Sequence, residues 1–182
     1  MPKIVDHDAK RAEITSQLAP LVTNGSIAAM GLREMAKHVG ISLGAFSHYF
    51  KTKDELLESL FKMYSQNTLA LLHQNIDLTL SPQKRILRSI ELILQNEEAC
   101  LVEVLLLVDQ ARARTSLQRR RRAKSYRFEQ VYVDELAKIF GIDHARCRYL
   151  LTYIVGLLVR RQWTEPDEDM KKQNELLLAA MF

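Results

Sequence analysis

The sequence predicts an all-α protein of about nine helices, and three observations support this prediction. Apolar residues recur at helical spacing along most of the 182-residue chain. Helix-capping residues separate these segments, and the alternation of apolar and polar residues that marks strands is scarce. Apolar residues make up 47% of the chain and charged residues 26%, which is typical of a folded globular protein.

Three short helices are expected first. The first begins near Asp8 and ends at Asn24-Gly25-Ser26, and Pro20 inside its apolar pattern predicts a kink or an early end. The second runs from Leu32 to Val39. The turn Gly40-Ile41-Ser42 follows, and its serine can cap a third helix of about seven residues.

Six longer helices follow. Thr52 and Glu55 form a capping box at the start of the fourth helix. The sixth is apolar nearly all round, which predicts a central position. The fourth helix extends to about Ile76, the fifth begins at Ser81-Pro82, and the sixth contains Cys100–Val108. The seventh runs from about Thr115 to Phe140, the eighth from Asp143 to about Trp163, and the ninth from Pro166-Asp167 to the end of the chain.

The net charge of +4 comes from one segment of the chain. Eight basic and no acidic residues lie between Arg112 and Arg127, and without these eight the balance is −4. The four consecutive arginines 119–122 point in four directions on a helix, so they form no basic stripe. They are expected to be solvated or paired with acidic groups rather than to contact DNA, and an acidic effector or partner protein is a further alternative. Bulk charge is therefore weak support for nucleic-acid binding.

Several classes of function find no support in the sequence. Cys100 and Cys147 have no partner motif, which favours a reducing compartment. The longest apolar run, Ala99 to Val108, spans ten residues with Glu103 inside it, against the roughly 20 of a membrane span, and no apolar signal core stands at the start. A cytoplasmic protein without membrane contact is expected. Metal-ligand spacing, a phosphate loop, a nucleophile elbow and paired catalytic carboxylates are missing, so no enzyme, cofactor or metal site is expected.

The segment around the Gly40-Ile41-Ser42 turn has the proportions of a helix-turn-helix. Apolar residues are expected to hold its two helices together, namely Met35, Ala36, Ile41 and Phe46. Small residues at the start of the third helix permit close approach to base edges in a major groove, and polar residues after them can reach phosphates. The candidate DNA contacts from the turn onward are Ser42, Leu43, Gly44, Ala45, Ser47, His48, Tyr49, Lys51 and Lys53.

The run LREMAKHVGISLGAFSHYFKTKDELL, residues 32–57, resembles the DNA-binding signature of TetR-type transcriptional regulators. The resemblance implies that Arg33 touches a base or a phosphate. It implies that Leu43, Gly44 and Ala45 lie nearest the base edges, and that Tyr49 and Lys53 clamp phosphates. Two positions depart from the family pattern: Gly31 replaces the usual Ser or Thr cap, and Ser47 replaces a common tyrosine. The Ser-His-Tyr-Phe form is similar to that of the branch containing choline-responsive repressors.

The resemblance also implies two domains. Residues 8–54 would form the helix-turn-helix DNA-binding domain, and residues 55–182 a larger C-terminal helical domain for effector binding and dimerisation. The last two helices form the dimer interface in this family, and here both are strongly apolar. A homodimer on a palindromic double-stranded DNA operator is therefore expected. The alternative is that these helices close the core of a monomer.

The implied effector is an unidentified small molecule bound among the later helices. Glu103 lies in the most apolar helix, where a buried carboxylate needs a partner. It could be the counter-ion of a cationic effector, although an internal pair with an arginine is the commoner arrangement. Further candidate pocket residues are Met63, Tyr126, Tyr149, Tyr153 and Trp163.

The sequence therefore predicts a sequence-specific DNA-binding transcriptional regulator, a homodimeric repressor relieved by a small molecule. Two alternatives stay open at this point. One is a DNA-binding protein of the same fold without an effector, which acts in nucleoid organisation or through a protein partner. The other is a helical interaction protein in which His48 and Tyr49 are merely solvated and the hairpin never meets DNA.

Overall fold

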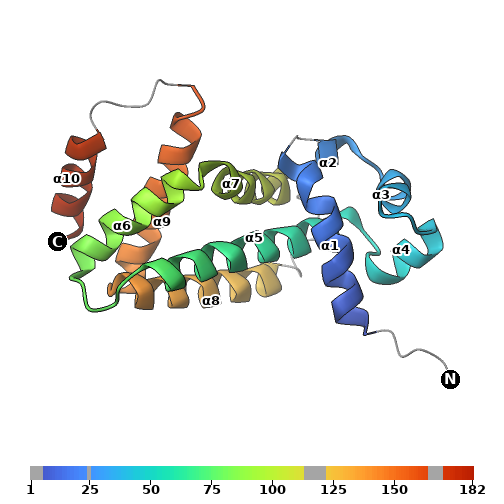
Figure 1. Cartoon of the computed structure of the whole chain (residues 1–182), viewed down its shortest axis with the longest axis horizontal. Helices are drawn as coiled ribbons and strands as arrows, with labels where there is room; N and C mark the ends of the chain where they lie inside the picture. The colour runs from blue at the N-terminus through green and yellow to red at the C-terminus, as the bar shows by residue number, and fades with distance from the viewer. Residues whose placement is uncertain (1–5, 24–25, 113–121, 164–169) are drawn as a thin grey trace. The chain divides into compact units, whose positions relative to one another are not determined.

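The computed structural model describes residues 6–23, 26–112, 122–163 and 170–182, and these residues form helices joined by short turns (Figure 1). The predicted all-α class is confirmed. The helices are α1 (His7–Thr23), α2 (Ser26–Ala29), α3 (Leu32–Val39), α4 (Leu43–Tyr49), α5 (Lys53–Asn75), α6 (Pro82–Gln95), α7 (Glu97–Arg112), α8 (Arg122–Phe140), α9 (His144–Arg160) and α10 (Met170–Met181). The four-residue α2 is the element that the sequence did not predict.

The chain folds into two compact units. Unit 1 comprises Met1–Gln66 and Val102–Arg114, and unit 2 comprises Asn67–Leu101 and Thr115–Phe182. The chain therefore passes from one unit to the other within α5 and again within α7.

The helix-start signals act as predicted. Ser42 Oγ accepts a hydrogen bond from the amide of Ala45 at 3.1 Å. Ser81 begins α6 in the same way, and Asp143 Oδ1 begins α9 by accepting from the amide of Arg146 at 2.9 Å. These side chains satisfy amides of the first turn that have no partner within the helix.

Pro20 does not end α1 early, because the helix continues to Thr23. Leu18 is fully buried and Val22 is 5% exposed, so both pack in the core of unit 1. We attribute the continuation to this packing, since burying each such side chain contributes about 1.5–3 kcal/mol, comparable to the cost of about 3 kcal/mol for an interior proline.

The core of unit 1 joins the short N-terminal helices to the start of α5. Its fully buried members include Ile14 and Leu18 of α1, Met35 of α3, Phe46 of α4 and Leu60 of α5. Side chains far apart in the sequence thus hold α3 and α4 in place, and helices this short depend on such packing for their stability.

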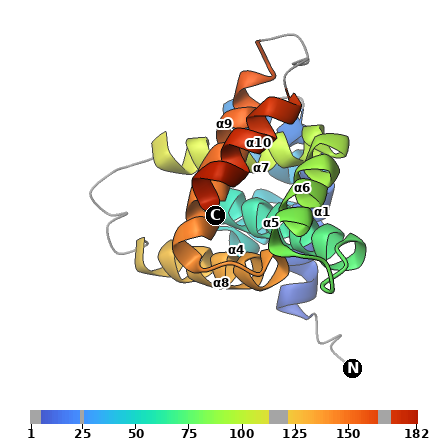
Figure 2. The ribbon, with the colours of Figure 1, turned by 90° about the vertical axis from the view of Figure 1, so that its left-hand side faces the viewer.

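The core of unit 2 is built from the later helices, with α8 packed against both α6 and α9. Arg146, in the first turn of α9, donates through Nε to the carbonyl of Met181 at 2.6 Å, so the end of α10 contacts the start of α9 (Figure 2). The fully or nearly fully buried side chains include Leu72, Ile86, Ile90, Val133, Phe140, Cys147, Leu150, Leu157 and Leu177.

The sixth expected helix, α7, is not covered on every side. Val102, Val104 and Leu106 are buried, whereas Leu105, Leu107 and Val108 are 46%, 42% and 44% exposed. Apolar composition all round a helix therefore does not ensure that neighbouring elements cover it all round. No helix in the described ranges is long and apolar enough to cross a membrane.

Gly141, in the turn between α8 and α9, occupies a conformation that other residues rarely adopt. Its φ is 71°, in the left-handed region, and a Cβ atom there would lie 2.9 Å from Arg85 Nη1. Arg85 has little freedom to move aside, because its guanidinium donates to the carbonyls of Leu78 and Leu80.

Gly141→Ala is therefore expected to lower the free energy of unfolding by about 2 kcal/mol. Urea denaturation followed by circular dichroism measures the change. Gly44→Ala is the matched control, because Gly44 is helical and the nearest atom to an added Cβ, Ser42 Oγ, is 3.9 Å away. That control should be neutral or stabilise by about 0.5–1 kcal/mol, and equal effects of the two substitutions would contradict the explanation.

Candidate nucleic-acid interface

The turn between α3 and α4 has the geometry that its sequence predicts. Gly40 adopts φ 75° and ψ 26°, the left-handed conformation that glycine favours. The amide of Gly40 donates to the carbonyl of Lys37 at 3.1 Å, and that of Ile41 to the carbonyl of Ala36 at 3.0 Å. These bonds close α3, and Ser42 then caps α4, so the direction of α4 is set within three residues.

The inner face of this helix pair is apolar and largely buried. Met35, Ala36 and Phe46 are each at most 1% exposed, as predicted, and Ile41 is half-buried. The rings of Phe46 and Phe50 lie 5.7 Å apart and are both fully buried. The inner face therefore fixes which side of α4 meets solvent.

The outer face of α4 carries most of the candidate base contacts. Leu43 is 37% exposed, and Ser42, Gly44, Ala45 and His48 are also exposed, whereas Ser47 is half-buried. Apart from Leu43, the first residues of this exposed face have side chains of two carbons or fewer. Another molecule can therefore approach the backbone of α4 closely.

Gly44 has no role in packing. An added Cβ would meet only Ser42 Oγ, at 3.9 Å, so the fold has room for a larger residue. Glycine inside a helix costs about 0.5–1 kcal/mol relative to alanine. Packing within the protein therefore does not require glycine at this exposed position.

The candidate phosphate contacts surround this face. Arg33 and Lys51 are exposed, and Tyr49 is half-buried. Lys53 is half-buried too, and its Nζ donates to the carbonyl of Met30 at 3.2 Å, which holds the start of α5 beside the segment before α3. Lys53 is thus a structural link in addition to being a predicted phosphate contact.

The capping box at the start of α5 forms with one difference from the prediction. The amide of Glu55 donates to Thr52 Oγ1 at 3.3 Å, as expected. The Glu55 carboxylate accepts from the amide of Lys51 at 2.9 Å, one residue before the cap. Asp54 and Glu55 place two carboxylates in the first turn, where they complement the helix dipole themselves and weaken its attraction for a phosphate.

Arg11 of α1 contacts the end of α4, the candidate recognition helix, and sequence reasoning missed this contact. Its guanidinium donates to the carbonyl of Tyr49 at the end of α4 and to Ser59 Oγ of α5 at 3.2 Å. It also lies 4.4 Å from the centre of the Phe50 ring. Arg11 therefore ties three helices together, and no local pattern could reveal contacts that span more than 35 residues.

The helix-turn-helix matches a known family. Residues 21–60 match the family model described as bacterial regulatory proteins, tetR family. The chain therefore carries a TetR-type helix-turn-helix domain. The matched residues run from the end of α1 into α5 and include every candidate DNA contact from Arg33 to Lys53.

A curated relative shares more than the TetR-type domain. The chain is 31% identical over 99 residues to the HTH-type transcriptional regulator PksA of Bacillus subtilis (strain 168). The match covers 54% of this chain and 48% of that protein, so it spans about half the length of either.

Solved structures resemble the fold over nearly the whole chain. The multidrug binding protein EbrR, complexed with imidazole, is similar with a TM-score of 0.71 at 17% identity, over 95% of each chain. BioQ, solved with its double-stranded DNA operator, is similar with a TM-score of 0.61 at 17% identity, over 94% of this chain and 96% of that one. At these identities the likeness concerns the fold, a TetR-type domain followed by further helices.

The predicted effector-pocket residues are divided between the two units. In unit 1, Met63 is half-buried against the core, and Glu103 is 8% exposed and accepts a hydrogen bond from Ser65 Oγ at 2.5 Å. In unit 2, Tyr149 and Trp163 are 51% and 80% exposed. Arg119, Arg120 and Arg121 lie outside the described residues, as do the side chains of Arg122 and Tyr126. The pocket stays a prediction.

Tyr153 is the predicted pocket residue with the most unusual environment. It is half-buried, and its hydroxyl is buried without a hydrogen-bond partner among the described residues. Burial raises the pKa of the Tyr153 hydroxyl, which therefore stays protonated at neutral pH. A buried hydroxyl in this state can donate a hydrogen bond to a polar ligand atom.

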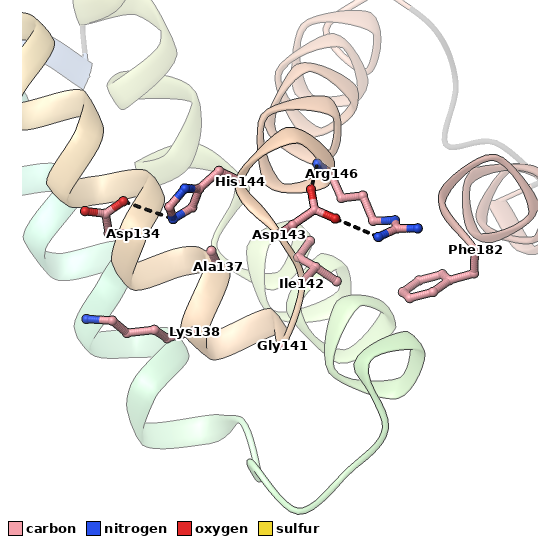
Figure 3. A pocket seen from close by; sticks show the side chains of 9 residues that line it. All are labelled: Asp134, Ala137, Lys138, Gly141, Ile142, Asp143, His144, Arg146 and Phe182. Carbon is pink, nitrogen blue, oxygen red and sulfur yellow. Dashed lines mark hydrogen bonds and ion pairs between the residues drawn. The ribbon is translucent and has the colours of Figure 1, made fainter.

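Unit 2 also has an open hollow of about 780 Å³ where α8 turns into α9 (Figure 3). His144 Nε2 lies 3.1 Å from Asp134 Oδ1, and Arg146 Nη1 lies 2.6 Å from Asp143 Oδ2. The amide of Arg146, together with its guanidinium, lowers the pKa of the Asp143 carboxyl. These rim charges are paired with protein groups, so the hollow is better explained as part of the turn than as a ligand site.

Two further features concern metal-ligating side chains and the Cys147 thiol. Over the parts of the chain that are described, no three His, Cys, Asp or Glu side chains converge as a metal site requires. Cys147 is fully buried, and burial raises the pKa of its thiol to about 11. The thiol is therefore protonated at neutral pH and is a poor nucleophile.

Proposed function

We propose that this protein is a homodimeric, sequence-specific DNA-binding transcriptional regulator, a repressor that a small molecule releases from its operator. The observation that carries the proposal is the outer face of α4. Gly44 and Ala45 are exposed there, while the buried side chain of Phe46 on the opposite face anchors the helix in the core. Such a face can enter a major groove with its backbone close to the base edges.

The proposed contacts fall into two kinds. Leu43, Gly44 and Ala45 would lie against base edges and set sequence preference. Polar and basic residues around them would bind phosphates and fix the register without reading sequence. This second group comprises Arg33, Ser42, Ser47, His48, Tyr49, Lys51 and Lys53. BioQ, whose structure includes its DNA operator, supports the assignment because the folds are similar.

Binding to DNA is tested by selecting duplexes from a random-sequence pool with the purified protein. The selected duplex should bind about 10³-fold or more tightly than unselected duplex of the same length. The logarithm of the binding constant should fall linearly with the logarithm of salt concentration, with a slope that counts the phosphates bound. If selected and unselected duplexes bind equally, the regulator proposal is wrong.

The proposed homodimer uses α9 and α10, in unit 2. These helices leave large apolar side chains exposed in the single chain: Tyr149 is 51%, Leu176 is 63% and Phe182 is 53% exposed. A second copy of the chain would cover them and present two α4 helices to successive turns of a palindromic operator. Sedimentation should show a species of about twice the 21.0 kDa chain mass, and a 21 kDa species alone at micromolar concentration would exclude this assembly.

The proposed division of labour assigns residues 8–54 to DNA and residues 55–182 to the effector and the dimer. EbrR, described as a multidrug binding protein, has a similar fold, which supports a ligand site among the later helices. Glu103 is the proposed counter-ion of a cationic effector, because its carboxylate is nearly enclosed. A thermal-shift screen of organic cations tests this, with Glu103→Gln expected to abolish any shift.

A second candidate is a DNA-binding protein of the same fold with no small-molecule effector, controlled by a protein partner. The exposed apolar side of α7, formed by Leu105, Leu107 and Val108, favours this candidate. The ligand screen separates the two, since only the first candidate predicts a compound that both stabilises the protein and weakens its binding to the selected duplex. The finer likeness to the branch that contains choline-responsive repressors, based on the Ser-His-Tyr-Phe form, is also a proposal, and it concerns the subfamily and not the ligand.

A further inference from the structure

Three aromatic rings meet at the carboxyl end of α4, and one of them comes from α1. The centre of the His7 ring lies 5.0 Å from that of Tyr49 and 5.2 Å from that of His48. The His48 and Tyr49 rings are 5.2 Å apart, with their planes at 81°. His7 and His48 are exposed and Tyr49 is half-buried. The cluster is therefore a surface feature that adds a residue of α1 to two proposed phosphate contacts.

The side chain of Arg11 fixes the start of α1 beside the end of α4, where the three rings meet. Arg11, one helical turn after His7, donates to the carbonyl of Tyr49. The side chain of Arg11 is further fixed by Ser59 Oγ at 3.2 Å and by the Phe50 ring. The start of α1 and the end of α4 are thus joined by a polar contact and by the rings, so His7 is positioned by the fold and is not a freely moving terminal side chain.

We infer that His7 is a further contact to the DNA backbone, which acts beside His48 and Tyr49 and binds a phosphate most strongly when its imidazole is protonated. The inference rests on the proposed DNA-binding function. Because the three rings are in contact, a phosphate that reaches His48 or Tyr49 also comes within reach of His7. A protonated imidazole donates two N–H groups and carries a positive charge, which makes its hydrogen bonds to phosphate stronger than neutral ones.

The two histidines should make DNA binding depend on pH. Imidazole gains its charge as pH falls from about 8 to 5. Two neighbouring imidazoles repel each other when both are charged, and a bound phosphate removes that cost. The protonated state is thus favoured in the complex, so proton uptake accompanies binding and affinity increases as pH falls.

Charged groups of both signs lie near His7 along α1. The carboxylate of Asp6 accepts from the amides of Asp8 and Ala9, and Lys10 pairs with Glu13 at 2.8 Å. Arg11 adds a cation whose guanidinium donates to the carbonyl of Tyr49.

The test compares wild type with His7→Gln on a labelled duplex that the wild-type protein selected from a random pool. Glutamine keeps a polar side chain but gains no charge. The variant should bind about tenfold more weakly at pH 6 and about twofold or less at pH 8. At pH 6 its salt slope should be smaller by about 0.9, the contribution of one phosphate, with no change at pH 8. The loss should be the same on an unselected duplex, because a backbone contact carries no sequence information.

Two further variants sharpen the test. His7→Lys keeps a positive charge at both pH values, so at pH 8 it should bind more tightly than wild type does at pH 8, and its affinity should change less between pH 8 and pH 6. His73→Gln removes an exposed imidazole in unit 2, on α5, and should leave the pH profile of wild type unchanged. Circular dichroism of each variant confirms the fold.

Two results would overturn the inference. One is wild-type affinity and pH dependence in His7→Gln. The other is an equal loss at pH 6 and pH 8 with unchanged salt slopes, which would assign His7 to packing alone. Failure of the proposed function is a separate outcome, because the wild-type protein would then select no duplex at all.

Discussion

Replacing Gly44 by leucine is expected to reduce binding to the selected duplex to the level of unselected DNA, a loss of about 10³-fold or more, while the protein stays folded. Gly44 is exposed on α4, and an added Cβ meets no atom closer than 3.9 Å, so the leucine side chain points to solvent in the free protein. In the complex the same side chain would fill the space between the helix and the base edges. The whole of α4 would then be held away from the groove.

Fluorescence anisotropy with a labelled duplex measures this loss, and urea denaturation checks stability. Leucine is a much better helix former than glycine, so the free energy of unfolding should stay the same or increase slightly. Gly44→Ala is the graded control, with an intermediate loss of affinity. If Gly44→Leu binds the selected duplex as tightly as wild type, the outer face of α4 does not enter a groove.

Phe46→Ala is expected to act through stability instead, with a loss of about 3–5 kcal/mol in the free energy of unfolding. Phe46 is fully buried, contacts the Phe50 ring, and joins the core that connects α1, α3 and α5. Its removal leaves a cavity beneath a seven-residue helix that cannot be stable alone. DNA binding should fail because α4 loses its fixed position.

Chemical denaturation measures the effect of Phe46→Ala, with Leu43→Ala as the control in the same helix. Leu43 is 37% exposed, so its truncation should change stability by about 1 kcal/mol or less. That control should still alter the preference among selected duplexes, because Leu43 is a proposed base contact. A cost below about 1 kcal/mol for Phe46→Ala would show that the core does not support α4 as described.

The N-terminal motif was predictable because its determinants are local. Gly40 permits a left-handed turn, Ser42 supplies a cap, and Met35 and Phe46 fall on facing sides at helical spacing. Each of these depends on neighbours within a few residues, so the bounds of α3 and the length of α4 follow from the sequence. The identity of the residues on the outer face of α4 can also be predicted, because the apolar residues determine which side of the helix is buried.

Contacts between distant segments were not predictable. Arg11 bonds to the carbonyl of Tyr49, and His7 contacts two rings of α4, across about 40 residues of chain. Sequence periodicity contains no information about such pairs, because they depend on how α1 crosses α4. For the same reason the hydrogen bond that Glu103 accepts from the Ser65 hydroxyl, 38 residues earlier, was not foreseen.

Exposure was the other property that periodicity did not determine. The helix α7 is apolar nearly all round, yet Leu105, Leu107 and Val108 remain open on one side. Trp163, a predicted pocket residue, is 80% exposed. An apolar side chain specifies that burial is favourable, but only the arrangement of the neighbouring elements decides whether anything covers it.

The sequence by itself determined the helical class, the caps, the turn at Gly40 and the small residues at the tip of α4, since each is set by interactions within one or two helical turns. The tertiary structure alone decided that Arg11 and His7 stand beside Tyr49, that Lys53 is tied to Met30, and that the predicted pocket residues fall in two different units. Those facts depend on side chains brought together across long stretches of chain, and local chemistry does not encode that geometry.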